Sequence, residues 1–287
     1  MVKGKKTIEY LRNKMATGGK ITYTACYDYP LARIAEKAGI DIILLGDSIA
    51  MVIEGNDSTV PADFEHMLRC ARAVRKGAPT VFLIGDMPYG TYFADIGETI
   101  KLAFRYFKEA TVDAIKVEGG LNVCPIIRAL TNATIPVVGH IGLTPQSALS
   151  LGGFKTQGRT AESAKRLVRE AREIEKAGAI AIAVECVPME IGKIIAEGAN
   201  LPILSTGAGP HCHGQFMNMY DLLGLFEEFR PKFVKRYANL HETAVAAMKE
   251  FIAEVESGRY PAEEHNYTMD KGQADLLIEE LKRENLI

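Results

Sequence analysis

Four apolar, strand-like runs each end in an acidic residue, and these residues are Asp47, Asp86, Glu118 and Glu185. If the runs are parallel strands, their carboxyl ends meet on one face, where active sites are commonly built. Four carboxylates gathered there would repel one another, and charged groups are costly to bury without partners. A divalent cation would relieve that cost, and all-oxygen ligation favours Mg²⁺ over Mn²⁺ or Ca²⁺.

Lys116 stands two residues before Glu118, so both side chains would share the inward face of one strand. A lysine there could stabilise a developing oxyanion. These residue types suggest one reaction scheme. A metal held by carboxylates chelates a 2-oxo acid, a further carboxylate removes the proton alpha to the carbonyl, and the metal and Lys116 hold the enolate.

Simpler interpretations stand beside this one. A single Asp at a strand end is commonly a helix N-cap or a solvated loop residue, although four together are harder to explain that way. Lys116 alone could be a structural ion pair. His140, between Gly139 and Ile141, could be a core histidine satisfied by the backbone.

The elements that must position these residues alternate along the chain. Short Val/Ile/Leu-rich runs, typical of strands covered on both faces, lie at 21–26, 41–46, 80–85, 113–117, 135–139, 179–184, 202–206 and 232–236. Amphipathic stretches typical of helices lie at 30–38, 62–75, 97–109, 161–177 and 241–257. Eight such alternations predict an α/β fold, the (β/α)8 TIM barrel, which takes about 250 residues. A doubly wound sheet is the alternative.

No linker or shift in composition divides the chain. We therefore predict a single barrel domain over 1–265 and a helical C-terminal extension over 266–287. The extension could be an oligomer contact or a frayed tail.

Composition excludes several classes of function. The 287 residues are 47% hydrophobic and 24% charged, as in an ordinary globular protein, and carry a formal net charge of −2. That balance argues against nucleic acid or an anionic membrane as partner. No apolar run approaches the roughly 18–20 residues that span a bilayer, and the basic N-terminus lacks the apolar core of a secretory signal. Five scattered cysteines fit reduced thiols, so we expect a cytoplasmic protein.

The sequence resembles the 3-methyl-2-oxobutanoate (ketopantoate) hydroxymethyltransferase family, which acts early in pantothenate and coenzyme A synthesis. Matching blocks extend from about 20 to 266. They include Ala-Cys-Tyr-Asp-Tyr at 25–29, Leu-Gly-Asp-Ser at 45–48, Asp-Met-Pro at 86–88, Lys-Val-Glu-Gly-Gly at 116–120, Gly-His-Ile-Gly-Leu-Thr-Pro-Gln-Ser at 139–147, Gly-Gly-Phe-Lys-Thr-Gln-Gly-Arg at 152–159 and Val-Glu-Cys-Val-Pro at 184–188.

The resemblance implies a barrel of the phosphoenolpyruvate mutase/isocitrate lyase type, assembled as a homodecamer. It implies Mg²⁺ bound at Asp47, Asp86 and Glu118. It also implies hydroxymethyl transfer from 5,10-methylenetetrahydrofolate to 3-methyl-2-oxobutanoate, which gives 2-dehydropantoate (ketopantoate).

The same resemblance implies roles for individual side chains toward the substrate. The 2-oxo acid would be held by Asp47, Ser48, Asp86 and Lys116, and we place His140 with them. Glu185 matches the proton acceptor, so Glu185 and Lys116 are the expected catalytic pair.

Some positions depart from the usual pattern of the family. His213 stands at a usual acidic position, Tyr220 at a usual His, and Asn56 at a usual His or Tyr; Ala50 replaces a usual Gly and Ala25 a usual Thr. We expect these changes to cluster around the mouth of the barrel, where they would favour a paralogous aldolase or C–C lyase acting on another 2-oxo acid. A non-catalytic binding or assembly protein on the same scaffold is the third alternative, and the intact acidic set argues against it.

Overall fold

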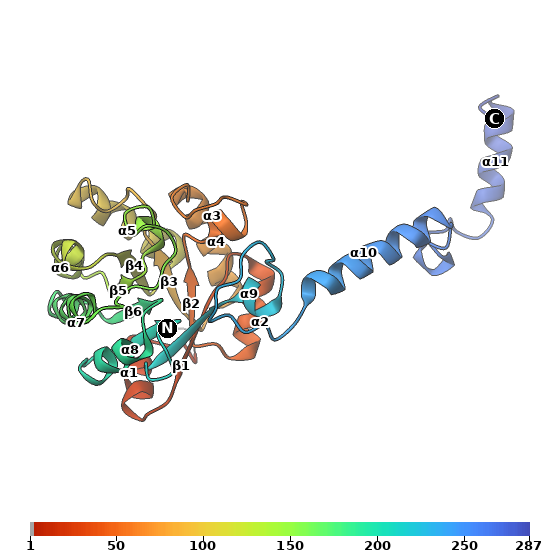
Figure 1. The fold of residues 1–287 in the computed structure, drawn as a ribbon. Helices are drawn as coiled ribbons and strands as arrows, with labels where there is room; N and C mark the ends of the chain where they lie inside the picture. Colours follow the sequence, from red (N-terminus) through yellow and green to blue (C-terminus); the bar gives the residue numbers. More distant parts are fainter. Residues whose placement is uncertain (1–2) are drawn as a thin grey trace. The chain divides into compact units, whose positions relative to one another are not determined.

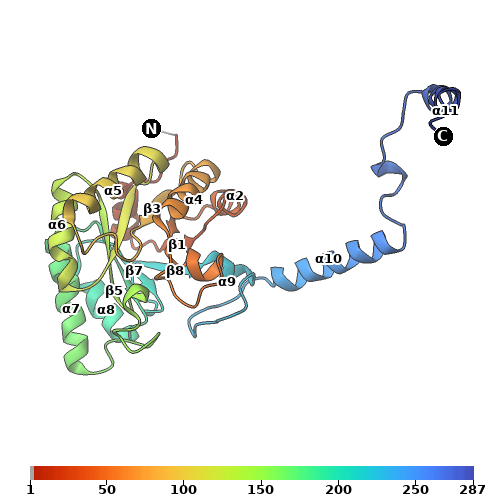
Figure 2. The same cartoon turned by 90° about the horizontal axis from the view of Figure 1, so that it is seen from above.

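A computed structural model describes residues 3–287 and contains a closed barrel of parallel strands. The strands pair in sequence order, and β1 pairs with β8 to close the barrel. Helices surround the strands (Figures 1 and 2). The closure confirms the (β/α)8 fold and excludes the doubly wound sheet, whose edge strands would stay unpaired. The strands are β1 Ile21–Ala25, β2 Ile42–Leu45, β3 Phe82–Asp86, β4 Ala114–Glu118, β5 Val137–Gly142, β6 Ala181–Glu185, β7 Ile203–Thr206 and β8 Gly214–Asn218.

The helices of the barrel confirm the amphipathic pattern at 30–38, 62–75, 97–109 and 161–177. They begin where a side chain caps the first turn: Asp28, Asp63, Asp95 and Thr160 each accept a hydrogen bond from a backbone N–H three residues later. The barrel helices are α1 Ile8–Ala16, α2 Tyr29–Ala38, α3 Ile49–Val52, α4 Phe64–Gly77, α5 Ile96–Ala110, α6 Cys124–Asn132, α7 Ala161–Lys176, α8 Met189–Glu197 and α9 Met219–Leu223, with 3₁₀ turns at Leu121–Val123 and Pro145–Ser147.

The eighth strand is not where the sequence predicted it. The run at 232–236 is irregular, and Gly214–Asn218 closes the barrel between β7 and β1. Gly214 suits this place because a Cβ there would come within 2.7 Å of Leu204 Cδ2 and 3.0 Å of the Ile21 carbonyl oxygen. Gly-Gln-Phe-Met-Asn has no β-branched residue, so it gave a weaker strand signal than Lys-Phe-Val-Lys-Arg.

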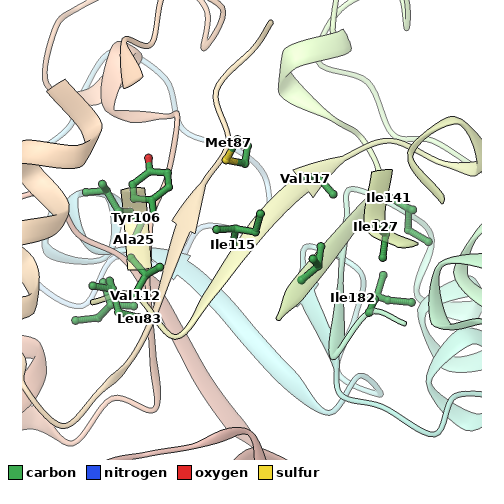
Figure 3. Packing of buried hydrophobic residues seen from close by; sticks show 14 of the residues in the cluster. Ala25, Leu83, Met87, Tyr106, Val112, Ile115, Val117, Ile127, Ile141 and Ile182 are labelled. Atoms are coloured by element: carbon green, nitrogen blue, oxygen red, sulfur yellow. The ribbon is translucent and has the colours of Figure 1, made fainter. Parts of the chain in front are cut away.

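Buried side chains form two layers, one inside the barrel and one between strands and helices. The inner layer includes Ile42, Phe82 and Leu204, with Leu11 of α1 packed against it. The outer layer includes Leu83, Ile115 and Ile182 on the opposite strand faces, seen in Figure 3 together with Tyr106 of α5. Burying each such side chain contributes about 1.5–3 kcal/mol and holds the strand ends in place.

The chain divides into two compact units, the first ending at Ala238 and the second covering Asn239–Ile287. The second unit contains α10 Leu240–Glu256, a 3₁₀ turn at Glu263–His265 and α11 Gln273–Arg283. The helical extension predicted over 266–287 lies within this second unit and contains α11. Within residues 3–287, no helix combines the length and apolar character needed to cross a membrane.

Candidate active site

The four acidic residues singled out by the sequence all line one cavity of about 590 Å³. Asp86, Glu118 and Glu185 are the last residues of β3, β4 and β6, and Asp47 follows β2. None of the four caps a helix, in contrast to Asp28, Asp63 and Asp95. The shared direction of the parallel strands brings these carboxylates together from distant parts of the chain.

Asp47, Asp86 and Glu118 form the buried acidic trio of the cavity. One carboxylate oxygen from each lies within 4.8 Å of the others, and the residues are 4%, 0% and 2% exposed. Burial raises the pKa of Asp47 well above its usual range, and the charges of Asp86 and Glu118 add to the rise. Burial likewise raises the pKa of Asp86, although Lys116 opposes it.

This trio suits a divalent cation. Its donors are carboxylate oxygens, which hard cations such as Mg²⁺ prefer. Asp86 Oδ1 is buried, and no group within residues 3–287 donates a well-directed hydrogen bond to it, although Lys116 Nζ lies 2.9 Å away as an ion pair. A cation would reduce the repulsion among the three carboxylates and would coordinate the Asp86 oxygen that receives no well-directed hydrogen bond from residues 3–287.

Lys116 places its ammonium group against two members of the trio. Its Nζ lies 2.9 Å from Asp86 Oδ1 and 2.6 Å from Glu118 Oε1. Burial alone would lower the pKa of Lys116, but the surrounding carboxylates outweigh it and raise that pKa well above the usual range. The side chain is therefore both an ion pair and a fixed cation in the lining of the cavity.

His140 bridges two carboxylates rather than resting on backbone groups. Its Nδ1 lies 3.0 Å from Glu118 Oε1, and its Nε2 lies 3.3 Å from Glu185 Oε2 without being aligned for a hydrogen bond. Burial would lower the pKa of His140, but Glu118 outweighs that and raises it to about 9. In return His140 and Lys116 overcome the effect of burial on Glu118 and bring the pKa of that carboxyl down to about 2.

Glu185 differs from the trio in its surroundings. Its side chain is 18% exposed, against 1% or less for Asp86 and Glu118, and it faces the cavity beside His140. Its carboxylate is therefore accessible to a molecule bound in the cavity, whereas the carboxylates of the trio are buried beneath the cavity surface.

Two neutral residues that the sequence analysis did not select hold Asp47 and Glu118 of the trio in position. Gln146 Nε2 donates to Asp47 Oδ2 at 2.9 Å, and the Gln146 backbone N–H donates to Glu118 Oε2 at 3.2 Å. Tyr92 Oη donates to Gln146 Oε1 at 2.6 Å, which fixes the orientation of the amide. Gln146 lies in the matched block at 139–147, but its lack of charge gave no signal of its own.

Ser48 also lines the cavity, and its hydroxyl group is hydrogen-bonded to Tyr27, which is in turn hydrogen-bonded to Asn218. The sequence analysis did not select Tyr27 or Asn218 either. Tyr27 Oη lies 2.7 Å from Ser48 Oγ, and Asn218 Nδ2 lies 2.8 Å from Tyr27 Oη.

The three polar departures from the family pattern do not line the cavity. His213 Nδ1 accepts a hydrogen bond from the Ile203 backbone N–H at 3.1 Å, so it supports β7. Tyr220 Oη donates to Asp28 Oδ2 at 2.7 Å. Asn56 Nδ2 donates to the Ala50 carbonyl at 3.0 Å. These three side chains are therefore engaged in hydrogen bonds within the protein and do not face the cavity.

Aromatic side chains dominate the outer part of the same cavity. Phe154, Phe226, Phe229 and Phe233 line it, and the Phe154 and Phe229 ring centroids lie 6.4 Å apart. Phe154 and Phe229 remain 44% and 51% exposed, so large apolar surfaces are open to a bound molecule. The run at 232–236, wrongly predicted as a strand, contributes Lys232 and Phe233 to this mouth.

Solved structures define the fold class of this barrel. A phosphonopyruvate hydrolase, in complex with oxalate and Mg²⁺, matches with a TM-score of 0.58 and 17% identity over 98% of this chain and 99% of its own. A 2,3-dimethylmalate lyase, a member of the PEP mutase/isocitrate lyase superfamily, matches with a TM-score of 0.56 and 18% identity over 91% and 88%. The chain therefore has the barrel fold of that superfamily, as the resemblance implied.

Sequence comparison identifies the family within this fold. The family model described as ketopantoate hydroxymethyltransferase matches residues 5–263. The 3-methyl-2-oxobutanoate hydroxymethyltransferase of Alkaliphilus metalliredigens is 45% identical over 93% of this chain and 94% of its own. That of Geobacillus kaustophilus is 44% identical over 92% and 95%. The chain belongs to the ketopantoate hydroxymethyltransferase family.

Proposed function

We propose that this protein transfers a hydroxymethyl group from 5,10-methylenetetrahydrofolate to 3-methyl-2-oxobutanoate and so forms 2-dehydropantoate. The observation that carries the proposal is the position of Glu185. It lines the same cavity as the buried carboxylate trio and the Lys116 cation. Relatives that carry the name of this activity, at 45% and 44% identity, support the choice of substrate.

The metal in this proposal is Mg²⁺, held by Asp47, Asp86 and Glu118. The bound metal would polarise the keto group as a Lewis acid and would thereby make the proton on the neighbouring carbon more acidic. The buried trio fits this use because its oxygens converge within 4.8 Å. Gln146 keeps Asp47 and Glu118 in fixed orientations through its side chain and its backbone N–H.

Glu185 acts as the general base in the proposed reaction. Its carboxylate takes the proton from C3 of 3-methyl-2-oxobutanoate, and the C–H electron pair enters the enolate. Lys116, with its pKa held high by its carboxylate neighbours, stays cationic and stabilises the negative charge on the substrate oxygens. His140 lies beside Glu185 Oε2 and would orient it. Ser48, Asp47, Asp86, Lys116 and His140 form the proposed substrate-binding set.

The second half of the reaction forms one carbon–carbon bond. The enolate carbon attacks the methylene carbon of the folate iminium ion, and the electrons of the C=N bond return to nitrogen. One water molecule then replaces the folate nitrogen. The water oxygen forms the C–O bond of the hydroxymethyl group, the C–N bond breaks, and the electron pair of that bond and one water proton leave with tetrahydrofolate. We propose that the pterin ring of the donor binds against the aromatic mouth, where Phe154 and Phe229 are exposed within the cavity.

The competing proposal is an aldolase or C–C lyase acting on another 2-oxo acid. It drew its support from the departures at His213, Tyr220 and Asn56, and none of these side chains lines the cavity. We therefore favour the hydroxymethyltransferase.

We also propose that the chain forms a homo-oligomer. In support, α10 carries large exposed apolar side chains, among them Met248 and Phe251. Light scattering of the purified protein tests this, and a monomeric mass would contradict it.

Product analysis tests the proposed reaction. The purified protein is incubated with Mg²⁺, 3-methyl-2-oxobutanoate and 5,10-methylenetetrahydrofolate, and mass spectrometry follows 2-dehydropantoate. Formation of this product, and its loss when either substrate is omitted, is the expected result. Cleavage of another 2-oxo acid, with no 2-dehydropantoate formed, would instead identify a lyase.

A further inference from the structure

A chain of hydrogen bonds lies behind one wall of the cavity. Asn218 Nδ2 lies 2.8 Å from Tyr27 Oη, which in turn lies 2.7 Å from Ser48 Oγ. Tyr27 is 3% exposed and does not line the cavity, whereas Ser48 and Asn218 do. Tyr27 follows β1, Ser48 follows β2 and Asn218 is the last residue of β8. The pairing of these strands around the closed barrel brings the three side chains together.

The donors and acceptors give this chain one direction. The Tyr220 backbone N–H donates to Asn218 Oδ1 at 3.1 Å, which fixes the amide and turns Nδ2 toward Tyr27. An amide nitrogen only donates, so Tyr27 Oη accepts that hydrogen bond.

The phenol proton then has Ser48 Oγ as its acceptor, the only one within hydrogen-bond distance among residues 3–287. If Ser48 donated instead, a buried phenol proton would have no acceptor, which is costly. Ser48 Oγ therefore accepts from Tyr27. Its own proton has no acceptor in the part of the chain that the structure describes.

We propose that Asn218 and Tyr27 are positioning residues that turn the Ser48 hydroxyl proton into the cavity, where it donates to the carboxylate of the 2-oxo acid. The assignment rests on the proposed function, which places Ser48 in contact with that acid. A hydroxyl whose proton points into the cavity favours an anionic oxygen as its partner there. In a cavity whose floor holds three carboxylates, such a donor helps an anionic substrate to bind.

A substitution that keeps the shape of the Asn218 side chain can reverse the direction of hydrogen-bond donation along this chain. Asn218→Asp keeps an acceptor for the Tyr220 N–H but offers Tyr27 an acceptor instead of a donor. Tyr27 then donates to residue 218 and accepts from Ser48, whose lone pairs now face the substrate carboxylate. We expect the dissociation constant of 3-methyl-2-oxobutanoate to rise about tenfold or more, the size of a lost hydrogen bond to a charged group. Tyr27→Phe interrupts the chain without reversing it, so its rise should be smaller, about threefold.

A double-mutant cycle separates this effect from the added negative charge. Calorimetric titration with 3-methyl-2-oxobutanoate, in the presence of Mg²⁺, is made on the unaltered protein, Asn218→Asp, Ser48→Ala and the double variant. If Asn218 acts through the Ser48 proton, Asn218→Asp weakens substrate binding when Ser48 is present. In the Ser48→Ala background, the same substitution then changes the dissociation constant by less than about twofold. Charge repulsion alone would persist in both backgrounds.

Three results would overturn the inference. One is that Asn218→Asp changes the dissociation constant by the same factor with Ser48 present and with Ser48→Ala. Another is that Asn218→Asp leaves the dissociation constant unchanged while the variant melts at the same temperature as the unaltered protein. If Asn218→Asp fails to fold, Tyr27→Phe takes its place in the cycle, and an equal effect with and without Ser48 is then the contradicting outcome. If the unaltered protein does not bind the oxo acid at all, the proposed function fails as well. Binding without the coupling overturns the inference alone.

Discussion

Gln146 Nε2 donates a hydrogen bond to Asp47 Oδ2 at 2.9 Å, although the two residues are 99 positions apart in the chain. The amide also donates to the Met87 carbonyl at 3.0 Å and accepts from Tyr92, so it has a single orientation. A neutral residue thus fixes a carboxylate whose neighbours carry like charges. Such supporting contacts commonly decide how well a metal site binds.

Replacing Gln146 should weaken the cation site without unfolding the barrel. Gln146→Leu removes the donor to Asp47 and leaves that carboxylate free to turn away from Asp86 and Glu118. We expect Mg²⁺ affinity, measured by calorimetry without substrate, to fall about tenfold or more, as for other residues that support metal ligands. Gln215→Leu, an exposed change on β8, is the control and should leave the affinity unchanged. Equal affinity in the Gln146 variant and the control would contradict this role.

Glu185→Gln should separate chemistry from metal binding. The change removes the base, while Asp47, Asp86 and Glu118 stay in place. Turnover to 2-dehydropantoate should fall by a factor of about 10² or more, the usual range for loss of a general base. Mg²⁺ affinity should stay within about twofold of the unaltered protein, because none of the proposed ligands is touched. Glu190→Gln, exposed on α8, is the matched control. Near-normal turnover of the Glu185 variant would rule out this base.

The charged positions of the site could be predicted because they mark the strand ends. Asp86, Glu118 and Glu185 each close an apolar run, and parallel strands bring such ends to one face. The neutral residues could not be found in this way. Gln146, Tyr92 and Asn218 act through hydrogen bonds to residues distant in the sequence, and neither charge nor periodicity reveals those partners.

The fold was predicted from the same alternation, with one error that has a physical cause. The first seven strands lie within a few residues of the predicted runs. The eighth, Gly214–Asn218, closes the barrel by fitting closely against Leu204 and Ile21, which depends on tertiary contacts rather than on strand propensity.

Asp41 provides a test of stability at the end of the barrel opposite the cavity. Burial would raise its pKa, but hydrogen bonds from Lys14 at 2.6 Å, the Thr22 backbone N–H at 2.8 Å and Tyr10 at 2.7 Å outweigh it, so the pKa is lowered. A lowered pKa in the folded state adds stability above the unfolded value of about 3.9, and that stability is lost as pH falls through the folded pKa. We expect Asp41→Asn to lower the free energy of unfolding by about 1–3 kcal/mol at pH 6.

Urea unfolding at pH 6 and at successively lower pH checks this sign. The difference between the unaltered protein and Asp41→Asn should shrink as the pH falls below about 4. Asp57→Asn, in an exposed loop, is the control and should show no such trend. A difference that grows toward low pH would contradict the role of Asp41.

Proton exchange at C3 of 3-methyl-2-oxobutanoate in D₂O tests the central claim most directly, because it needs the oxo-acid site and no folate. The purified protein with Mg²⁺ is followed by proton NMR, beside Glu185→Gln under the same conditions. We predict loss of the C3 proton signal with the unaltered protein and its retention with the variant. No exchange with the unaltered protein, or equal exchange with Glu185→Gln, would contradict a reaction in which Glu185 removes this proton.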